Sequence, residues 1–151
     1  MTFWGVGPKL VGTGIIYSIL VALIHRFYLS NLVLPISNLI ALLAGISLII
    51  TGLLIWLVPA MTIKRSFDQG KLLTTGIYGY IRHPLYSGII LFITTGVVVI
   101  TKSVIGLSIP ILLAILFYIW IKEEDDYLEE RFGEEFIEYK KRVGALLPKI
   151  K

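Results

Sequence analysis

The chain has 151 residues, enough for one domain, and we expect a single domain over residues 1–151. Hydrophobic residues make up 56% and charged residues only 16%, a balance that indicates a membrane protein rather than a soluble one. The chain has no cysteine and two histidines, so disulfides, thiolate nucleophiles and metal sites built from cysteine or several histidines are excluded. The formal charge of +4 does not indicate a nucleic-acid partner, because the basic residues flank apolar runs instead of forming one face.

The first two apolar runs are predicted to cross a membrane. The first covers about residues 7–24 and ends in a His-Arg pair rather than in a small-residue cleavage site, so we interpret it as a retained span and not as a signal peptide. The second covers residues 36–58, which is long enough to cross a hydrocarbon core of about 30 Å at about 1.5 Å per residue. Pro35 and Pro59 bracket the second run, and we expect both to mark helix ends.

A polar loop, residues 62–84, leads to two further apolar runs at about residues 85–101 and 104–121. Because so few residues separate these two runs, we expect them to form a tight antiparallel helical hairpin. Pro110 lies inside the last run, where it is expected to kink the helix. Together the runs predict an all-α fold, a polytopic membrane helical bundle of about four transmembrane helices.

The distribution of Lys and Arg predicts the orientation of the bundle. If the spans alternate in direction, most basic residues near their ends share one side with the polar loop and the tail, residues 122–151, and we expect that side to be cytoplasmic. The tail has apolar residues at steps of three and four, which predicts a cytoplasmic C-terminal amphipathic helix. The basic residues on the predicted cytoplasmic side are Lys9, Lys64, Arg65, Lys71, Arg82 and Lys122. The apolar stripe of the tail consists of Leu128, Phe132, Phe136, Tyr139 and Val143.

Polar groups gather in a loop, residues 70–86, and in an acidic cluster where the last run ends. Antiparallel neighbours bring these two places to the same side, so we expect Arg82, His83 and Tyr86 to face the acidic cluster around Glu124. Each group alone has a simpler interpretation: a topology-setting charge, a helix-entry residue, an aromatic at the membrane interface, or the solvated start of a helix. Their combination in a chain poor in polar residues indicates a binding pocket instead.

Such a pocket suits a zwitterionic ligand with an aromatic part, and S-adenosylmethionine (SAM) has these properties. Its carboxylate needs Arg or backbone donors, its ammonium and sulfonium favour a carboxylate or aromatic faces, and its adenine favours an apolar slot. The strand–glycine–helix unit that soluble methyltransferases use is not visible in the sequence. A SAM site is therefore expected to be built from the helices and loops of the membrane bundle.

The segment from Thr75 to Tyr86 resembles the T-G-x-Y…R-H-P-x-Y motif of the isoprenylcysteine carboxyl methyltransferase family and its prokaryotic relatives. The resemblance continues through the acidic pair Glu124 and Asp125 to residues 143–148, and it covers roughly the C-terminal half of the chain. It implies a SAM-dependent methyltransferase that acts in the membrane on a lipid-like acceptor, with S-adenosyl-L-homocysteine (SAH) as product. Carried over by position, the family's cofactor contacts fall on Gly70, Lys71, Leu72, Leu73, Tyr78, His83, Pro84, Leu85, Tyr86 and Glu124. The candidate catalytic residues are Arg82, His83 and Glu124.

Two departures from the family pattern bear on the acceptor. The second of the family's paired glutamates is shortened to Asp125 here. The arginine that eukaryotic prenylcysteine enzymes place four residues before the pair is Trp120, with Lys122 as a candidate substitute. The resemblance therefore implies a lipid or a small prenylated substrate that enters from the bilayer, without identifying the acceptor. Because the distribution of Lys and Arg places the polar loop and the tail on the cytoplasmic side, we expect the active site to face the cytoplasm.

Three alternatives remain open. Phospholipid N-methyltransferases share the architecture, and an amine acceptor would need His83 or Glu124 to remove a proton. A non-enzymatic membrane module would bind no SAM and would leave the convergence of Arg82, His83 and Glu124 without a purpose. A reductase like the sterol reductases would need a nicotinamide site, in a family of much longer chains.

Overall fold

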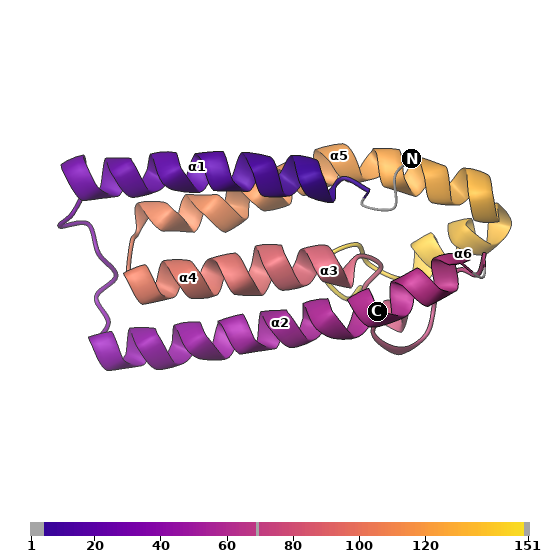
Figure 1. Cartoon of the computed structure of the whole chain (residues 1–151), viewed down its shortest axis with the longest axis horizontal. Coiled ribbons are helices and arrows are strands. Elements are labelled where there is room, and N and C mark those ends of the chain that lie inside the picture. Colours follow the sequence, from indigo (N-terminus) through magenta and orange to yellow (C-terminus); the bar gives the residue numbers. More distant parts are fainter. Residues whose placement is uncertain (1–4, 69, 150–151) are drawn as a thin grey trace.

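Four long helical segments run side by side in the computed structural model, which describes the backbone of residues 5–68 and 70–149 and the side chains of residues 5–62 and 70–149 (Figure 1). The first two are α1 (Gly7–Tyr28) and α2 (Asn38–Asp68). The third span consists of α3 (Pro84–Ser87), the π-helix η2 (Gly88–Ile93) and α4 (Thr94–Thr101). The fourth begins with the 3-10 helix η3 (Ile105–Leu107) and continues as α5 (Ser108–Phe132).

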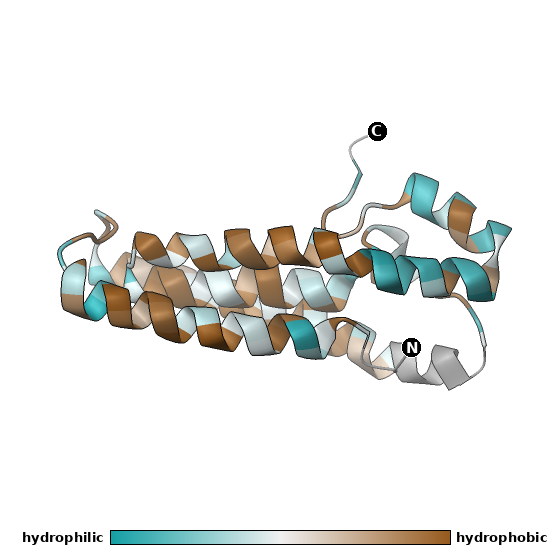
Figure 2. Ribbon diagram, turned by 90° about the horizontal axis from the view of Figure 1, so that it is seen from above, coloured by the Kyte–Doolittle hydropathy of each residue, from teal (hydrophilic) through white to brown (hydrophobic). Residues whose placement is uncertain are grey.

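These helices have the length and composition of membrane spans, as predicted. The four segments long and apolar enough to cross a membrane are Gly7–Tyr28, Asn38–Thr62, Pro84–Thr101 and Ile105–Phe132. Many of their large apolar side chains point outward, such as Ile16 with 72% exposure and Met61 with 80%. Hydrocarbon is the solvent in which such a surface is stable, so the chain is an integral membrane protein. Figure 2 shows hydrophobic residues along the bundle and hydrophilic residues gathered at one end, where α5 passes into the tail.

Glycines allow α2 to pack closely against the third span. A Cβ atom on Gly45 would lie 2.6 Å from the backbone oxygen of Gly96, and one on Gly52 would lie 2.7 Å from that of Gly88. Small residues at helix interfaces let backbones approach in membranes, where dispersion rather than the hydrophobic effect holds helices together. On the other side of the bundle α1 packs mainly against α5. The bundle is thus built from two helix pairs.

The structure corrects two expectations about prolines. Pro59 was expected to end the second span, but α2 continues through it to Asp68. Helices in membranes tolerate proline because neighbouring groups satisfy the freed carbonyl. Pro110 was expected to kink the last span from within, but it lies in the first turn of α5, directly after η3. A first-turn residue has no intrahelical partner for its N–H, so proline costs little there.

The tail also differs from the single amphipathic helix that the sequence predicts. The last span runs on as α5 to Phe132, the chain turns at Gly133 with a φ of +53°, and a short helix α6 (Glu134–Arg142) follows. Only glycine adopts that left-handed conformation at low cost. The predicted apolar stripe nevertheless stays together, because Phe136, Tyr139 and Val143 form one buried cluster that contacts Leu128 and Phe132 on α5.

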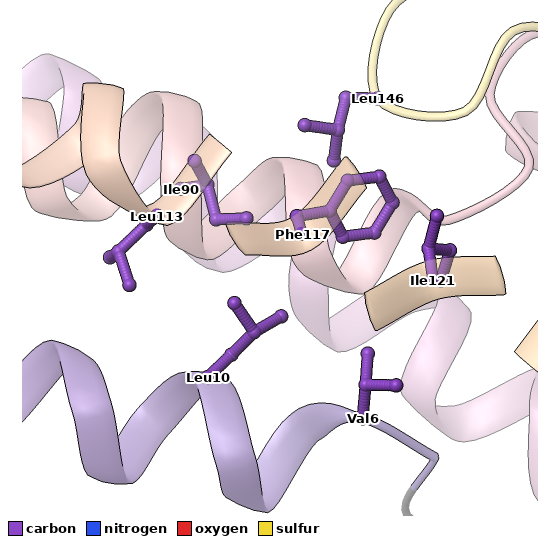
Figure 3. Packing of buried hydrophobic residues seen from close by; sticks show 7 residues of the cluster. All are labelled: Val6, Leu10, Ile90, Leu113, Phe117, Ile121 and Leu146. Carbon is purple, nitrogen blue, oxygen red and sulfur yellow. The ribbon is translucent and has the colours of Figure 1, made fainter. Parts of the chain in front are cut away.

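The core of the molecule lies toward the end of the bundle that carries the tail (Figure 3). Phe117 is fully buried at its centre. The cluster draws residues from the start of the chain, the third span, α5 and the segment that follows α6, so it joins these four parts of the chain. Its buried members are Val6, Leu10, Ile90, Leu113, Phe117, Ile121 and Leu146.

The segment that follows α6 is hydrogen-bonded to the loop that precedes the third span. Arg82 and His83 donate their backbone N–H groups to the carbonyls of Gly144 and Ala145, at 2.8 and 3.0 Å. The hydroxyl of Ser87 donates to the carbonyl of Leu146 at 2.7 Å. Two residues that carry candidate catalytic side chains are therefore held by backbone that follows α6.

Candidate functional site

Two local features shape the loop before the third span, a 3-10 helix and the start of α3. The 3-10 helix η1 (Gly76–Gly79) begins at Gly76, whose φ of +61° needs glycine. His83 is the residue before helix α3, and Pro84 occupies the first helical position, where proline is favoured. The Arg-His-Pro sequence thus starts a span and leaves Arg82 and His83 at its entry.

On one side of His83 lies Glu124 of α5. Nδ1 of His83 is 3.4 Å from Oε1 of Glu124, and the hydroxyl of Tyr86 donates to Oε2 at 3.0 Å. Sequence reasoning predicted this meeting of His83 and Tyr86 with Glu124, and the structure confirms it. The turn just before α1 also reaches this place, since a Cβ atom on Gly5 would collide with the Glu124 carboxylate and lie 2.9 Å from the Tyr86 hydroxyl.

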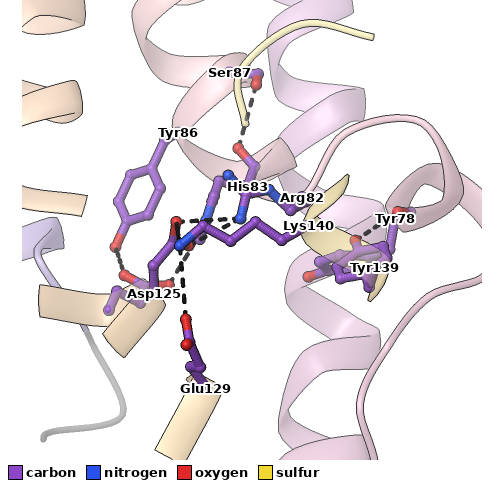
Figure 4. Close-up of polar contacts among 10 residues, drawn as sticks. Tyr78, Arg82, His83, Tyr86, Ser87, Asp125, Glu129, Tyr139 and Lys140 are labelled. Atoms are coloured by element: carbon purple, nitrogen blue, oxygen red, sulfur yellow. Dashed lines mark hydrogen bonds and ion pairs between the residues drawn. The ribbon is translucent and has the colours of Figure 1, made fainter. Parts of the chain in front are cut away.

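On the other side of His83 lies Asp125, which is buried (Figure 4). Nε2 of His83 is 3.3 Å from its Oδ1, the guanidinium of Arg82 is 3.1 Å from Oδ2, and Nζ of Lys140 on α6 is 3.2 Å from Oδ2. Arg82 therefore pairs with Asp125, not with Glu124. Sequence reasoning left Asp125 and Lys140 out of the candidate site, although the position of Asp125 within the acidic pair was a signal for the first of them.

The two carboxylates decide the charge of the imidazole. Burial of His83 by itself lowers its pKa, because it penalises the charged form, but hydrogen bonds to Asp125 and Glu124 and their negative charges outweigh burial, so that the pKa is raised. The hydrogen-bond roles of the two ring nitrogens follow from this. A protonated imidazole donates from both nitrogens, one to each carboxylate.

Aromatic rings connect this polar cluster to the apolar interior. The ring of Phe117 lies 5.7 Å from that of His83 and 5.4 Å from that of Tyr86. Tyr86 also lines an apolar groove of about 330 Å³ between α1 and the third span. The walls of the groove include Leu10, Ile15 and Ile19 from α1 and Ile89, Ile90 and Thr94 from the third span. The hydroxyl of Tyr86 thus faces Glu124 while its ring borders a space suited to hydrocarbon.

Two buried polar atoms in the same region have no hydrogen-bond partner among the described residues, namely the Tyr78 hydroxyl and Nε of Arg82. Burial raises the pKa of Tyr78, and the nearby Tyr139 and Glu124 raise it further, so the hydroxyl keeps its proton as a donor. Tyr139 on α6 donates its own hydroxyl to the Tyr78 carbonyl at 2.6 Å. Buried donors without partners are rare, and they are suited to an anionic or carbonyl group of a ligand.

The remaining candidate residues lie at the start of the third span and in the segment 70–73. Pro84 is buried and Leu85 is half-buried at the start of the third span. Gly70 and Lys71 are exposed, while Leu72 packs against the apolar cluster of α6 and Leu73 is half-buried. Trp120 packs against the core, and Lys122 is exposed. The described contacts therefore bring His83, Tyr86 and Glu124 together directly, and they join the 70–73 segment to the tail.

Comparison with known proteins gives consistent matches. A family model described as phospholipid methyltransferase matches residues 39–135. Protein-S-isoprenylcysteine O-methyltransferase B of Arabidopsis thaliana is 28% identical over 113 residues, which cover 69% of this chain and 57% of the relative. A probable protein-S-isoprenylcysteine O-methyltransferase of Oryza sativa subsp. indica is 31% identical over 115 residues, covering 70% of this chain and 60% of the relative. The Homo sapiens protein-S-isoprenylcysteine O-methyltransferase is 37% identical over 84 residues, covering 56% of this chain but 30% of the relative. The chain thus spans less than two thirds of the length of each of these relatives.

Proposed function

Since the chain belongs to the phospholipid methyltransferase family and has isoprenylcysteine O-methyltransferases as relatives, we propose that it transfers a methyl group from SAM to a lipid-like acceptor at the membrane. The observation that carries this proposal is that Tyr86 belongs both to the cluster with His83 and Glu124 and to the lining of an apolar groove. A polar cluster and a hydrocarbon-binding groove that share one residue suit a reaction between a charged cofactor and an acceptor held in the bilayer.

The residues of the site fit SAM. Glu124 is the more exposed of the two carboxylates that flank His83, with 20% of its side chain exposed against 7% for Asp125, and it would oppose the positive charges of the cofactor. The Tyr78 hydroxyl and Nε of Arg82 are buried donors without partners among the described residues, suited to the cofactor's carboxylate. The half-buried ring of Tyr86 offers an aromatic face for a cation. When bound, SAM supplies an electrophilic methyl group on its sulfonium.

The protein contributes position and a water-poor setting. Bound hydrocarbon in the groove would hold the acceptor's polar end near Tyr86, and the hydrogen bond from Tyr86 to Glu124 would keep the two sides of the site aligned. The buried cluster of Phe136, Tyr139 and Val143 keeps the tail over the polar side, which limits the entry of water. We place this side in the cytoplasm, on the strength of the basic residues that flank the spans.

A carboxylate acceptor suits the cluster better than an amine. A carboxylate attacks in its ordinary ionised form, whereas an ammonium must first lose a proton to a base. The raised pKa of His83 favours the protonated imidazole between the two carboxylates, and in that form the ring has no free nitrogen to accept a proton. We therefore propose carboxyl O-methylation, with N-methylation of a phospholipid amine as a second candidate favoured by the description of the matching family model.

Two measurements test the proposal. Calorimetric titration of the purified protein with SAH should give saturable binding, and no binding would reject a SAM-dependent function. Incubation with SAM labelled in its methyl group and with membrane lipid extracts or farnesylcysteine should move label into the lipid fraction. Alkali releases methanol from methyl esters but leaves N-methyl groups intact. Alkali-stable label would therefore reject the carboxylate in favour of the amine.

A further inference from the structure

Asp125 occupies a position that methyl transfer as proposed above does not require, since it touches neither the apolar groove nor the face of His83 that Glu124 occupies. It is 5% exposed and holds three basic side chains from three parts of the chain: Arg82 in the loop, His83 at the entry to the third span, and Lys140 on α6. So many partners for one buried carboxylate require an explanation, because each charge brought there loses hydration.

We propose that Asp125 and Lys140 act as a positioning pair, which fixes the His83 imidazole against Glu124 and makes its placement depend on the docking of α6. The inference rests on the proposed function and deepens it. Asp125 bonds to Nε2, the ring nitrogen opposite the one that faces Glu124. A ring bonded at both nitrogens cannot rotate without breaking one contact, so Asp125 orients the ring from behind.

The charges around the imidazole are balanced only with α6 in place. Arg82 and Lys140 supply two cations, and Asp125, Glu124 and Glu129 supply three carboxylates, with Glu129 lying 3.9 Å from Lys140. A protonated His83 brings this group to neutrality. Among the described residues Tyr86 also lies against His83, and its hydroxyl donates a hydrogen bond to Glu124. Without Lys140, Asp125 would lose one of its cationic partners, and the charges around His83 would sum to a net negative charge.

Phe136 joins the packing of α6 to this charge network. Its ring is fully buried, with the guanidinium of Arg82 at 5.9 Å and Nζ of Lys140 at 5.7 Å from its centroid. Cations over an aromatic face are attracted by the ring, so Phe136 attracts two of the three basic partners of Asp125, Arg82 and Lys140. Packing of Phe136 therefore places Lys140 beside Asp125. If α6 moved away from the bundle, the chain would turn at Gly133.

Titration of His83 by nuclear magnetic resonance tests the proposal directly. The chain has only two histidines, so a His25→Gln background leaves one imidazole signal. Asp125→Asn removes a negative charge from Nε2 and should lower the pKa of His83 by about one unit or more. Lys140→Met removes a positive charge and should raise that pKa, by less because Lys140 is 39% exposed and partly screened by water. Opposite signs are expected only if both residues act on the ring electrostatically.

Matched variants of the tail complete the test. Lys141→Met is the control, because Lys141 pairs with Glu138 on the exposed side of α6. It should leave the titration unchanged, and Lys140→Arg should restore the behaviour of the unmodified chain. In methyl transfer, Lys140→Met should lower kcat with little change in KM for SAM. Equal shifts from Lys140→Met and Lys141→Met, or an unchanged titration in both, would overturn the proposal even if Asp125→Asn does not fold. Because the titration needs no SAM and no acceptor, its outcome is separate from that of the SAH calorimetry.

Discussion

Replacing Glu124 by Gln should separate the roles that its carboxylate can play. The change keeps the size of the side chain and its hydrogen bond from Tyr86, but it removes the negative charge that lies 3.4 Å from His83. The side chain is only 20% exposed, so water screens this charge weakly. A cationic ligand bound beside Glu124 would therefore lose a charge-assisted interaction that solvent does not replace.

The expected magnitude follows from the value of such a contact. A hydrogen bond to a charged group is worth about 1.5–3 kcal/mol, so the affinity for SAM should fall by roughly ten- to a hundredfold. SAH lacks the positive sulfonium. If Glu124 faces the sulfonium, the affinity for SAH should fall less than that for SAM. If Glu124 holds the ammonium or the ribose, both ligands should weaken equally.

Calorimetric titration of the Glu124→Gln protein with both ligands measures these changes. The matched control is Asp126→Asn, because Asp126 lies two residues further along the same helix and is exposed to solvent. The control should be nearly neutral, since exposed charges contribute little. Equal and small effects from both variants would refute the reasoning, because the acidic cluster would then be no more than a solvated part of α5.

Three further predictions concern stability and orientation. The carboxylates beside His83 raise its pKa despite its burial, so protonation of His83 should stabilise the folded protein. This contribution should be complete below about pH 6.5 and should be lost as the pH rises through the raised pKa. Thermal unfolding at several pH values should show this trend, and His83→Gln should remove it. Gly52→Ala should lower the free energy of unfolding by about 1–3 kcal/mol, because the added Cβ would collide with the backbone of the third span. Gly12→Ala should be neutral or slightly stabilising, since no other group lies within 4 Å of the added Cβ. In single-cysteine variants, a reagent confined to the cytoplasm should label position 71 and not position 26, and the reverse pattern would reject the proposed orientation.

Much of the fold could be predicted because its determinants are local. The length of each apolar run, compared with the thickness of a bilayer, decides whether a helix spans it, and four runs yielded four spans. The short connection after Thr101 decides that the last two spans are antiparallel, and this alone places His83 and Tyr86 near Glu124. The helical ends were less well predicted at Pro59 and Gly133, because proline in a membrane helix is tolerated and the glycine turn lies within a continuous amphipathic pattern.

The different partners of the two neighbouring acids, Glu124 and Asp125, depend on how the helices pack. Adjacent residues on a helix point about 100° apart, so the rotation of α5 determines that Glu124 meets Nδ1 of His83 while Asp125 meets Nε2. No local pattern encodes that rotation, since it results from the packing of Phe117 and Ile121 against the core. The meeting of Lys140 with Asp125 depends on the turn at Gly133, which sets the direction of α6. The apolar runs and their short connections are therefore enough to predict which helices cross the membrane and which of their ends meet, whereas side-chain packing sets which charge faces which atom.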